Sequence, residues 1–167
     1  MRDALHESNS KLDGVMNGAD SPAPGKVEFA HGIKGALAPV FEKMRDNIAA
    51  AYPFGSGTNG QTSPMSDIDL AVLLTGKELG ASFDIRLDLY ADCCRVLKRN
   101  EVDVVVLNKT RNLFLLYDVV RNGILLFDGD SGLREEFEVM AVHDFIEFRE
   151  HRIKVMGGLM EKESTTR

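Results

Sequence analysis

Apolar residues recur at helical spacing early in the chain and then give way to a short run typical of a strand. The helical set consists of Ile33, Leu37, Phe41, Met44 and Ile48. This spacing predicts a helix over most of residues 33–47, with Pro39 either kinking it or occupying its first turn. Residues 49–54 favour a strand that stops close to Pro53, where a proline is tolerated because the strand is ending.

Three further strands are predicted after a polar loop at residues 55–66, which contains almost no apolar side chain. The first covers residues 67–74 and begins with two carboxylates before an apolar run. The second covers residues 102–107 and is rich in valine, and the third covers residues 124–127.

The helical period returns in three stretches after the loop. The first stretch has an apolar stripe that we expect to pack on the sheet, formed by Phe83, Leu87, Tyr90, Cys94 and Leu97. The second stretch ends at Gly123 and is marked by Leu113, Leu116, Tyr117 and Val120. The third follows a turn at residues 128–132 and is expected to end at Gly157-Gly158. Its residues expected to face the core are Leu133, Phe137, Met140 and Phe148.

The order of these elements predicts an α/β (α+β) fold, with a small mixed sheet of about four to five strands and helices packed mainly on one side. A length of 167 residues suits a single domain. We expect residues 27–156 to form that domain. Residues 1–26 are polar and rich in Gly and Pro, so they predict a flexible N-terminal tail, and residues 157–167 predict a flexible C-terminal one.

Composition narrows the possible partners. The chain has 26 acidic and 20 basic residues and a net charge of -6, which makes nucleic acid an unlikely partner. Cys93 and Cys94 are adjacent within a helical pattern, so a bridge between them would be strained, and they suit a reducing compartment. No apolar stretch is long enough to cross a membrane, and the first 26 residues lack the apolar core of a signal peptide. We therefore expect a cytoplasmic protein without a membrane partner.

Three aspartates are the main candidates for chemistry. Asp67 and Asp69 are two apart on a predicted strand, so they project from the same face. Taken singly, Asp67 could cap the loop and Asp69 could lie at an exposed edge. Asp103, however, interrupts an apolar strand where a buried, uncompensated carboxylate would be costly. If the two strands are neighbours, the three carboxylates converge, and they predict a site for Mg²⁺ or Mn²⁺.

The polar loop begins with Gly55-Ser56 directly after a strand, which predicts a backbone cradle for phosphate. A P-loop is the competing interpretation, but its lysine is missing and an acidic strand follows where a helix should begin. Position 54 is Phe, so the nucleophile motif of the serine hydrolases is absent as well.

Gly55-Ser56, ten intervening residues and then Asp67-Ile68-Asp69 resemble the signature of the polymerase-β-like nucleotidyltransferases, specifically their minimal (MNT) branch. The resemblance covers most of residues 33–155 and includes Asp103. It implies transfer of a nucleoside monophosphate from ATP or another nucleoside triphosphate to an acceptor hydroxyl.

The same resemblance assigns roles to single residues. It implies that Asp67, Asp69 and Asp103 hold the metal and that Gly55 and Ser56 hold the β and γ phosphates. Additional hydrogen bonds are expected from two further residues, Thr58 and Ser66. Positions 57 and 59 are Gly and Asn where the family often has basic residues, which implies a weaker grip on the triphosphate.

Minimal members are commonly paired with a HEPN-domain protein, typically a ribonuclease toxin, and resemble antitoxins that attach AMP to a tyrosine of that partner. The resemblance therefore favours an antitoxin that modifies a HEPN protein. Two alternatives remain: an enzyme acting on a small molecule such as an antibiotic, and a noncatalytic module that neutralises its partner by contact.

Overall fold

The computed structural model describes residues 24–55, 67–76 and 80–164. Their centre is a mixed sheet of four strands: β1 (Ile48–Phe54), β2 (Ile68–Leu74), β3 (Val102–Val106) and β4 (Phe127–Asp128). The strand order is β3-β2-β1-β4, so β3 and β4 are the edge strands. β1 runs antiparallel to both β2 and β4, whereas β2 and β3 are parallel.

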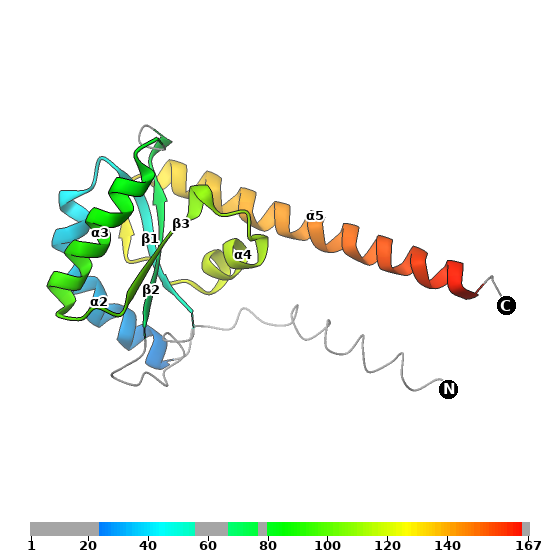
Figure 1. The fold of residues 1–167 in the computed structure, drawn as a ribbon, viewed down its shortest axis with the longest axis horizontal. Helices are drawn as coiled ribbons and strands as arrows, with labels where there is room; N and C mark the ends of the chain where they lie inside the picture. The colour runs from blue at the N-terminus through cyan, green and yellow to red at the C-terminus, as the bar shows by residue number, and fades with distance from the viewer. Residues whose placement is uncertain (1–23, 56–66, 77–79, 165–167) are drawn as a thin grey trace.

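Helices cover both faces of the sheet (Figure 1). α2 (Pro24–Lys43) and α3 (Ser82–Leu97) pack on one face, and α4 (Leu113–Asn122) and the first part of α5 (Ser131–Ser164) pack on the other. A 3-10 turn, η3 (Leu107–Lys109), joins β3 to α4. The described residues therefore form three layers, with an apolar core on each side of the sheet.

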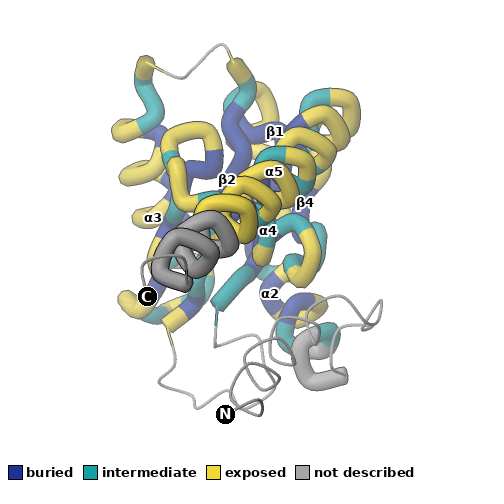
Figure 2. Tube along the Cα trace, turned by 90° about the vertical axis from the view of Figure 1, so that its right-hand side faces the viewer, coloured by how far each residue is buried: buried dark blue, intermediate teal, exposed yellow. Residues whose placement is uncertain are grey.

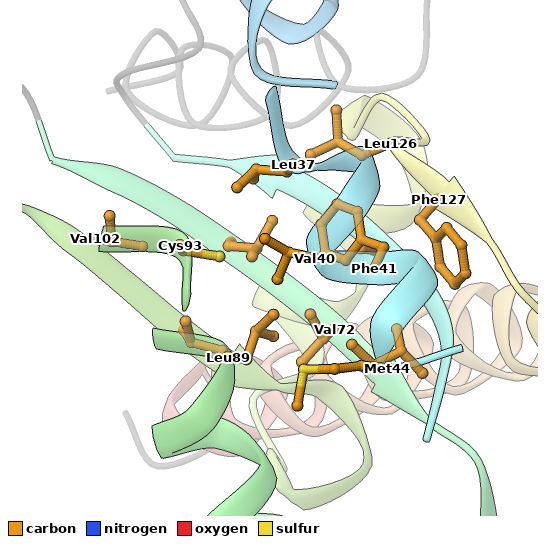
Figure 3. Packing of buried hydrophobic residues seen from close by; sticks show 14 of the residues in the cluster. Leu37, Val40, Phe41, Met44, Val72, Leu89, Cys93, Val102, Leu126 and Phe127 are labelled. Atoms are coloured by element: carbon orange, nitrogen blue, oxygen red, sulfur yellow. The ribbon is translucent and has the colours of Figure 1, made fainter. Parts of the chain in front are cut away.

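The larger core lies between the sheet and α2 and α3. Figure 3 shows Phe41 of α2 lying beside Phe127 of β4, and the two rings stack with centroids 5.4 Å apart. On the other side of α2, Val40 and Met44 lie close to Val72 of β2. The alternating residues of β2 explain this, because Ile68, Leu70, Val72 and Leu74 all point to this face.

The predicted fold class is confirmed, since the sheet is mixed, has four strands and belongs to an α+β fold. The distribution of the helices differs from the expectation that they pack mainly on one side. α4 and α5 cover the second face because β1 and β2 are apolar on both faces, where Ala49, Ala71 and Leu73 are buried. The bounds of two helices also differ from the prediction. α2 begins at Pro24 and contains Pro39, and α5 continues past Gly157-Gly158 and ends at Ser164.

The predicted inward stripe of α3 is wrong in part, because only Cys94 and Leu97 of that stripe pack against the core. Its buried apolar residues are Ile85, Leu89 and Cys93, whereas Phe83 and Leu87 are exposed. Both sets recur at helical spacing, so the period alone does not say which one faces the sheet.

The predicted stripe of α5 is wrong in part. Phe137 is buried as expected, but it is joined by Ala141 and Phe145, and Met140 is exposed. Phe145 packs on Tyr117 of α4, with ring centroids 4.0 Å apart, so α4 determines which face of α5 turns inward.

A buried carboxylate links the two helices of the larger core. Asp92 of α3 accepts hydrogen bonds from Lys43 of α2 at 2.7 Å and from Arg95 at 2.6 Å. These two cations lower the pKa of Asp92 below its ordinary value, the Lys43 hydrogen bond being the largest cause. The ion pair therefore offsets the cost of burying a charge at this helix contact.

A second polar group anchors the start of α5 to the sheet. Tyr52 of β1 donates a hydrogen bond to Glu138 at 2.7 Å, and Arg134 donates to the other oxygen of Glu138 at 3.0 Å. Arg134 also forms an ion pair with Asp128 of β4 at 3.2 Å. Sequence reasoning did not find this group because Tyr52 and Glu138 are 86 residues apart.

Candidate active site

The candidate site lies at one edge of the sheet, where β1 ends and β2 and β3 begin. β1 and β2 are antiparallel, so the end of β1 and the start of β2 meet there, with Phe54 paired to Asp69. β3 is parallel to β2 and pairs Asp103 with the same residue, Asp69. Since neighbouring strands are about 4.8 Å apart, the two carboxylates start from adjacent backbone positions.

The aspartates project from the face of the sheet that carries α4 and α5. In β2 the residues at odd positions after Asp69, namely Ala71 and Leu73, belong to the core on that face. In β3, Val102 and Val104 point to the opposite core, so Asp103 between them projects from the same face as Asp69.

The three aspartate side chains differ in their exposure to solvent. Asp67, directly before β2, is exposed, Asp69 is half-buried and Asp103 is exposed. The expectation that Asp103 would be buried is therefore wrong, because β3 is an edge strand and no described helix covers it at this position. Asp103 consequently carries little desolvation cost, and Asp69 is the carboxylate in the least favourable surroundings.

The surroundings of Asp69 raise its pKa above the ordinary value of a carboxyl group. Burial is the largest cause, followed by the charge of Asp103 and then by the charge of Asp67. A divalent cation beside Asp69 would reverse all three effects, because it would replace lost hydration and neutralise the mutual repulsion.

Gly55 brings the backbone directly against this carboxylate. Its φ is +79°, a conformation that residues with a side chain rarely adopt. A Cβ at this position would also overlap the Oδ2 atom of Asp69. Glycine is therefore required here for two reasons, and the chain leaves β1 in contact with the candidate metal ligand.

The donor set fits Mg²⁺, which is commonly held by one or two carboxylates, water and substrate phosphates. Within the described ranges, three ligand residues with atoms all within 4.8 Å of one another occur only at His143, Asp144 and Glu147 of α5, which are exposed. The oxygens of Asp67, Asp69 and Asp103 are thus more widely spread. Such spacing leaves room for the phosphate oxygens that complete the coordination in nucleotide enzymes.

Three of the predicted nucleotide-binding residues, Ser56, Thr58 and Ser66, lie outside the described residues, and their roles stay predictions. Of the predicted phosphate cradle, the structure describes Gly55. None of the described helices is long and apolar enough to cross a membrane.

The turn at Gly55 and the three aspartates thus lie together where β1 ends and β2 and β3 begin. Residues 36–132, more than half of the chain, match the family described as Polymerase beta, Nucleotidyltransferase. The chain belongs to this family and is a nucleotidyltransferase. A comparison with curated protein sequences finds no match.

Solved structures support the same fold. A chain of a toxin–antitoxin crystal structure with AMP-PNP aligns with a TM-score of 0.57 at 22% identity, over 76% of this chain and 98% of that one. A chain from the complex of a tri-AMPylated Shewanella oneidensis HEPN toxin with an MNT antitoxin aligns with a TM-score of 0.54 at 21% identity. That alignment covers 78% of this chain and 98% of the other.

Proposed function

We propose that this chain is an antitoxin that transfers AMP from ATP to a hydroxyl group of a HEPN-domain protein, in a reaction that depends on Mg²⁺ or Mn²⁺. One observation carries the proposal: Asp69 is paired in register with Asp103 and is in contact with the turn at Gly55. Similar chains occur in a toxin–antitoxin structure with AMP-PNP and in a complex with a tri-AMPylated HEPN toxin.

The reaction forms one bond and breaks another at the α phosphorus of ATP. The acceptor oxygen bonds to this phosphorus while the bridge to the β phosphate breaks, so the products are an AMP ester and pyrophosphate. The acceptor proton leaves to a base or to water. Asp103 is the candidate base, in addition to its proposed role as a metal ligand, because it is exposed beside Asp69.

The three aspartates share one role in this proposal. Asp67, Asp69 and Asp103 would hold the metal, which would polarise the α phosphate and stabilise the departing pyrophosphate. The turn at Gly55, together with Ser56, would hold the β and γ phosphates through backbone N–H groups and a hydroxyl. We further propose that Thr58 and Ser66 add hydrogen bonds to the nucleotide.

The proposed compartment is the cytoplasm. Cys93 and Cys94 are both free thiols, as expected for a reducing environment where ATP and Mg²⁺ are abundant.

Calorimetric titration with ATP in Mg²⁺ buffer tests the first half of the proposal. The native chain should bind ATP, and the Asp67→Ala/Asp69→Ala double variant should not. Asp88→Ala is the matched control, because Asp88 is an exposed aspartate on α3, away from this edge of the sheet. Absence of metal-dependent binding by the native chain would contradict an enzymatic role and would favour an antitoxin that acts by contact alone.

Incubation with α-labelled ATP and a HEPN protein encoded beside this chain tests the second half. Intact-mass measurement should show the HEPN protein gaining one AMP for each modified hydroxyl, with pyrophosphate released in equal amount. If the native chain binds ATP but labels only a small molecule, the antitoxin assignment fails and the small-molecule alternative replaces it.

A further inference from the structure

The second half of α5 has features that the nucleotide site does not explain. α5 has 34 residues, which corresponds to a length of about 51 Å at 1.5 Å per residue. Its last buried residue among those described is Phe145, after which the helix continues away from the sheet (Figure 1). From residue 150 to residue 155 every side chain is exposed. This part of α5 therefore lacks the tertiary packing that normally supports a helix. Without such packing, a helical segment is only marginally stable in water.

An apolar stripe follows this helix at a spacing of seven residues. It consists of Val139, Ile146 and Ile153, which are 71%, 44% and 58% exposed. We call these three residues the heptad stripe. Apolar residues repeated every seven residues occupy one of the two positions in each heptad through which one helix packs along another, and β-branched side chains are common there. Figure 2 shows that much of this outer surface of α5 is exposed.

Charges are separated along the same helix. Between residues 135 and 147 there are five acidic residues and no lysine or arginine. Between residues 149 and 155 there are three basic residues and one acidic residue. Two such helices placed side by side in parallel would bring acid against acid and base against base. An antiparallel pair would bring each acidic segment against a basic one.

The heptad stripe is symmetric about Ile146, because Val139 and Ile153 are each seven residues away. In an antiparallel pair centred on Ile146, Val139 therefore faces Ile153 of the second copy. Glu136 and Lys154 flank the stripe on the same side, so Glu136 lies beside Lys154 of the second copy. This arrangement is self-complementary, as the interface of a two-fold dimer must be.

We infer that the heptad stripe of α5 binds a second copy of this chain, through antiparallel pairing of the two α5 helices about Ile146. The pairing joins two nucleotidyltransferase domains through α5, which carries none of the predicted site residues. It is independent of nucleotide and of the proposed acceptor, so its failure would leave the proposed function untouched.

Sedimentation velocity of the full chain, without nucleotide, tests this inference. An interface made by one helix pair is small, so the measurement should extend to about 200 μM protein. The native chain should change from monomer to dimer as its concentration rises. Ile146→Glu should raise the dissociation constant of the dimer at least tenfold, because it places two like charges at the centre of the pair.

Val155→Glu is the matched control. Val155 is 48% exposed, similar to Ile146, and lies nine residues further along the helix, which is about two and a half turns and hence on the opposite side. This variant should change the dissociation constant by less than twofold. Circular dichroism should show equal helix content in both variants, which keeps loss of helix apart from loss of pairing.

A charge exchange tests the antiparallel direction. Glu136→Lys and Lys154→Glu should each weaken the dimer severalfold, and the double variant should restore it, because each exchanged charge again faces its opposite. Tighter pairing by Lys154→Glu alone would overturn the antiparallel arrangement. Two results would overturn the inference as a whole: a native chain that stays monomeric at about 200 μM, or equal effects of Ile146→Glu and Val155→Glu. A heptad stripe that binds a HEPN protein instead of a second copy would give the first of these results.

Discussion

Replacing Asp69 by asparagine should stabilise the metal-free protein and at the same time abolish its activity. Asparagine has nearly the same shape as aspartate, so the packing at the end of β2 should be preserved. The substitution removes the charge that is half-buried and that faces Asp103 on the neighbouring strand. It also removes a proposed metal ligand, which makes stability and function move in opposite directions.

The size of the stability gain follows from the pairing. Side-chain pairs on neighbouring strands contribute about 0.2–1 kcal/mol, and like charges directly opposite are destabilising by a comparable amount. With partial burial of Asp69 added, Asp69→Asn should raise the free energy of unfolding by about 0.5–1 kcal/mol. For a chain of this size that corresponds to a rise in Tm of about 1–4 °C.

The pH dependence has a defined sign. Because the pKa of Asp69 is raised in the folded state, the folded protein holds this proton more tightly than the unfolded chain. The stability of the native protein therefore falls as the pH rises from the ordinary pKa of a carboxyl group to the raised one. The advantage of Asp69→Asn should be complete above that window and should disappear below about pH 4.

Thermal unfolding with EDTA and with saturating Mg²⁺ measures both effects. In EDTA the variant should melt above the native protein, whereas Mg²⁺ should raise the Tm of the native protein and leave the variant nearly unchanged. AMP transfer should fall by at least about a hundredfold, since even residues that only orient metal ligands commonly cost tenfold to a hundredfold. Asp88→Asn, on the exposed side of α3, should alter neither quantity. A variant that melts below the native protein in EDTA, or keeps its response to Mg²⁺, would contradict the proposed role of Asp69.

Three further substitutions test other parts of the structure. Gly55→Ala should lower stability by about 1–2 kcal/mol, because of the positive φ and the contact with a carboxylate, and should weaken ATP binding at least tenfold in calorimetry. Asp92→Asn should cost about 1–2 kcal/mol in urea unfolding at neutral pH. Since the pKa of Asp92 is lowered, that difference should shrink as the pH falls below about 4, and a constant difference would exclude the ion pairs as its cause. Tyr52→Phe should cost about 1 kcal/mol by losing its hydrogen bond to Glu138, while AMP transfer by the folded variant stays within twofold of native.

The first three strands could be predicted from the sequence, because each is a short apolar run between polar segments. The fourth was predicted at residues 124–127, whereas β4 is confined to Phe127–Asp128, where it pairs with Ala50 and Ala51 of β1. β2 and β3 were predicted to within one or two residues of their bounds. The sequence also predicted that Asp69 and Asp103 converge, on the condition that their two strands are neighbours. The structure meets that condition by parallel pairing in register.

The orientation of the helices could not be predicted in the same way. α3 has two apolar sets at helical spacing, and choosing between them requires knowing where Lys43 of α2 meets Asp92. The burial of Asp103 was predicted wrongly because the sequence of a strand does not say whether it lies at the edge or in the centre of a sheet. Both errors concern contacts between residues far apart in the chain, which hydrophobic periodicity does not encode.

The topology of the sheet explains how a short chain brings these groups together. Antiparallel pairing of β1 with β2 returns the chain to the edge it has just left, so Gly55 and Asp67 stay at that edge whatever path the intervening loop takes. The parallel crossover through α3 then starts β3 at the same edge and adds Asp103. The positions of the aspartates are thus determined by strands that are buried behind them, in which Leu70 and Val72 are fully enclosed. Buried strands hold Asp69 and Asp103 at paired backbone positions despite their repulsion, so the proposed metal site would be formed before any nucleotide arrives.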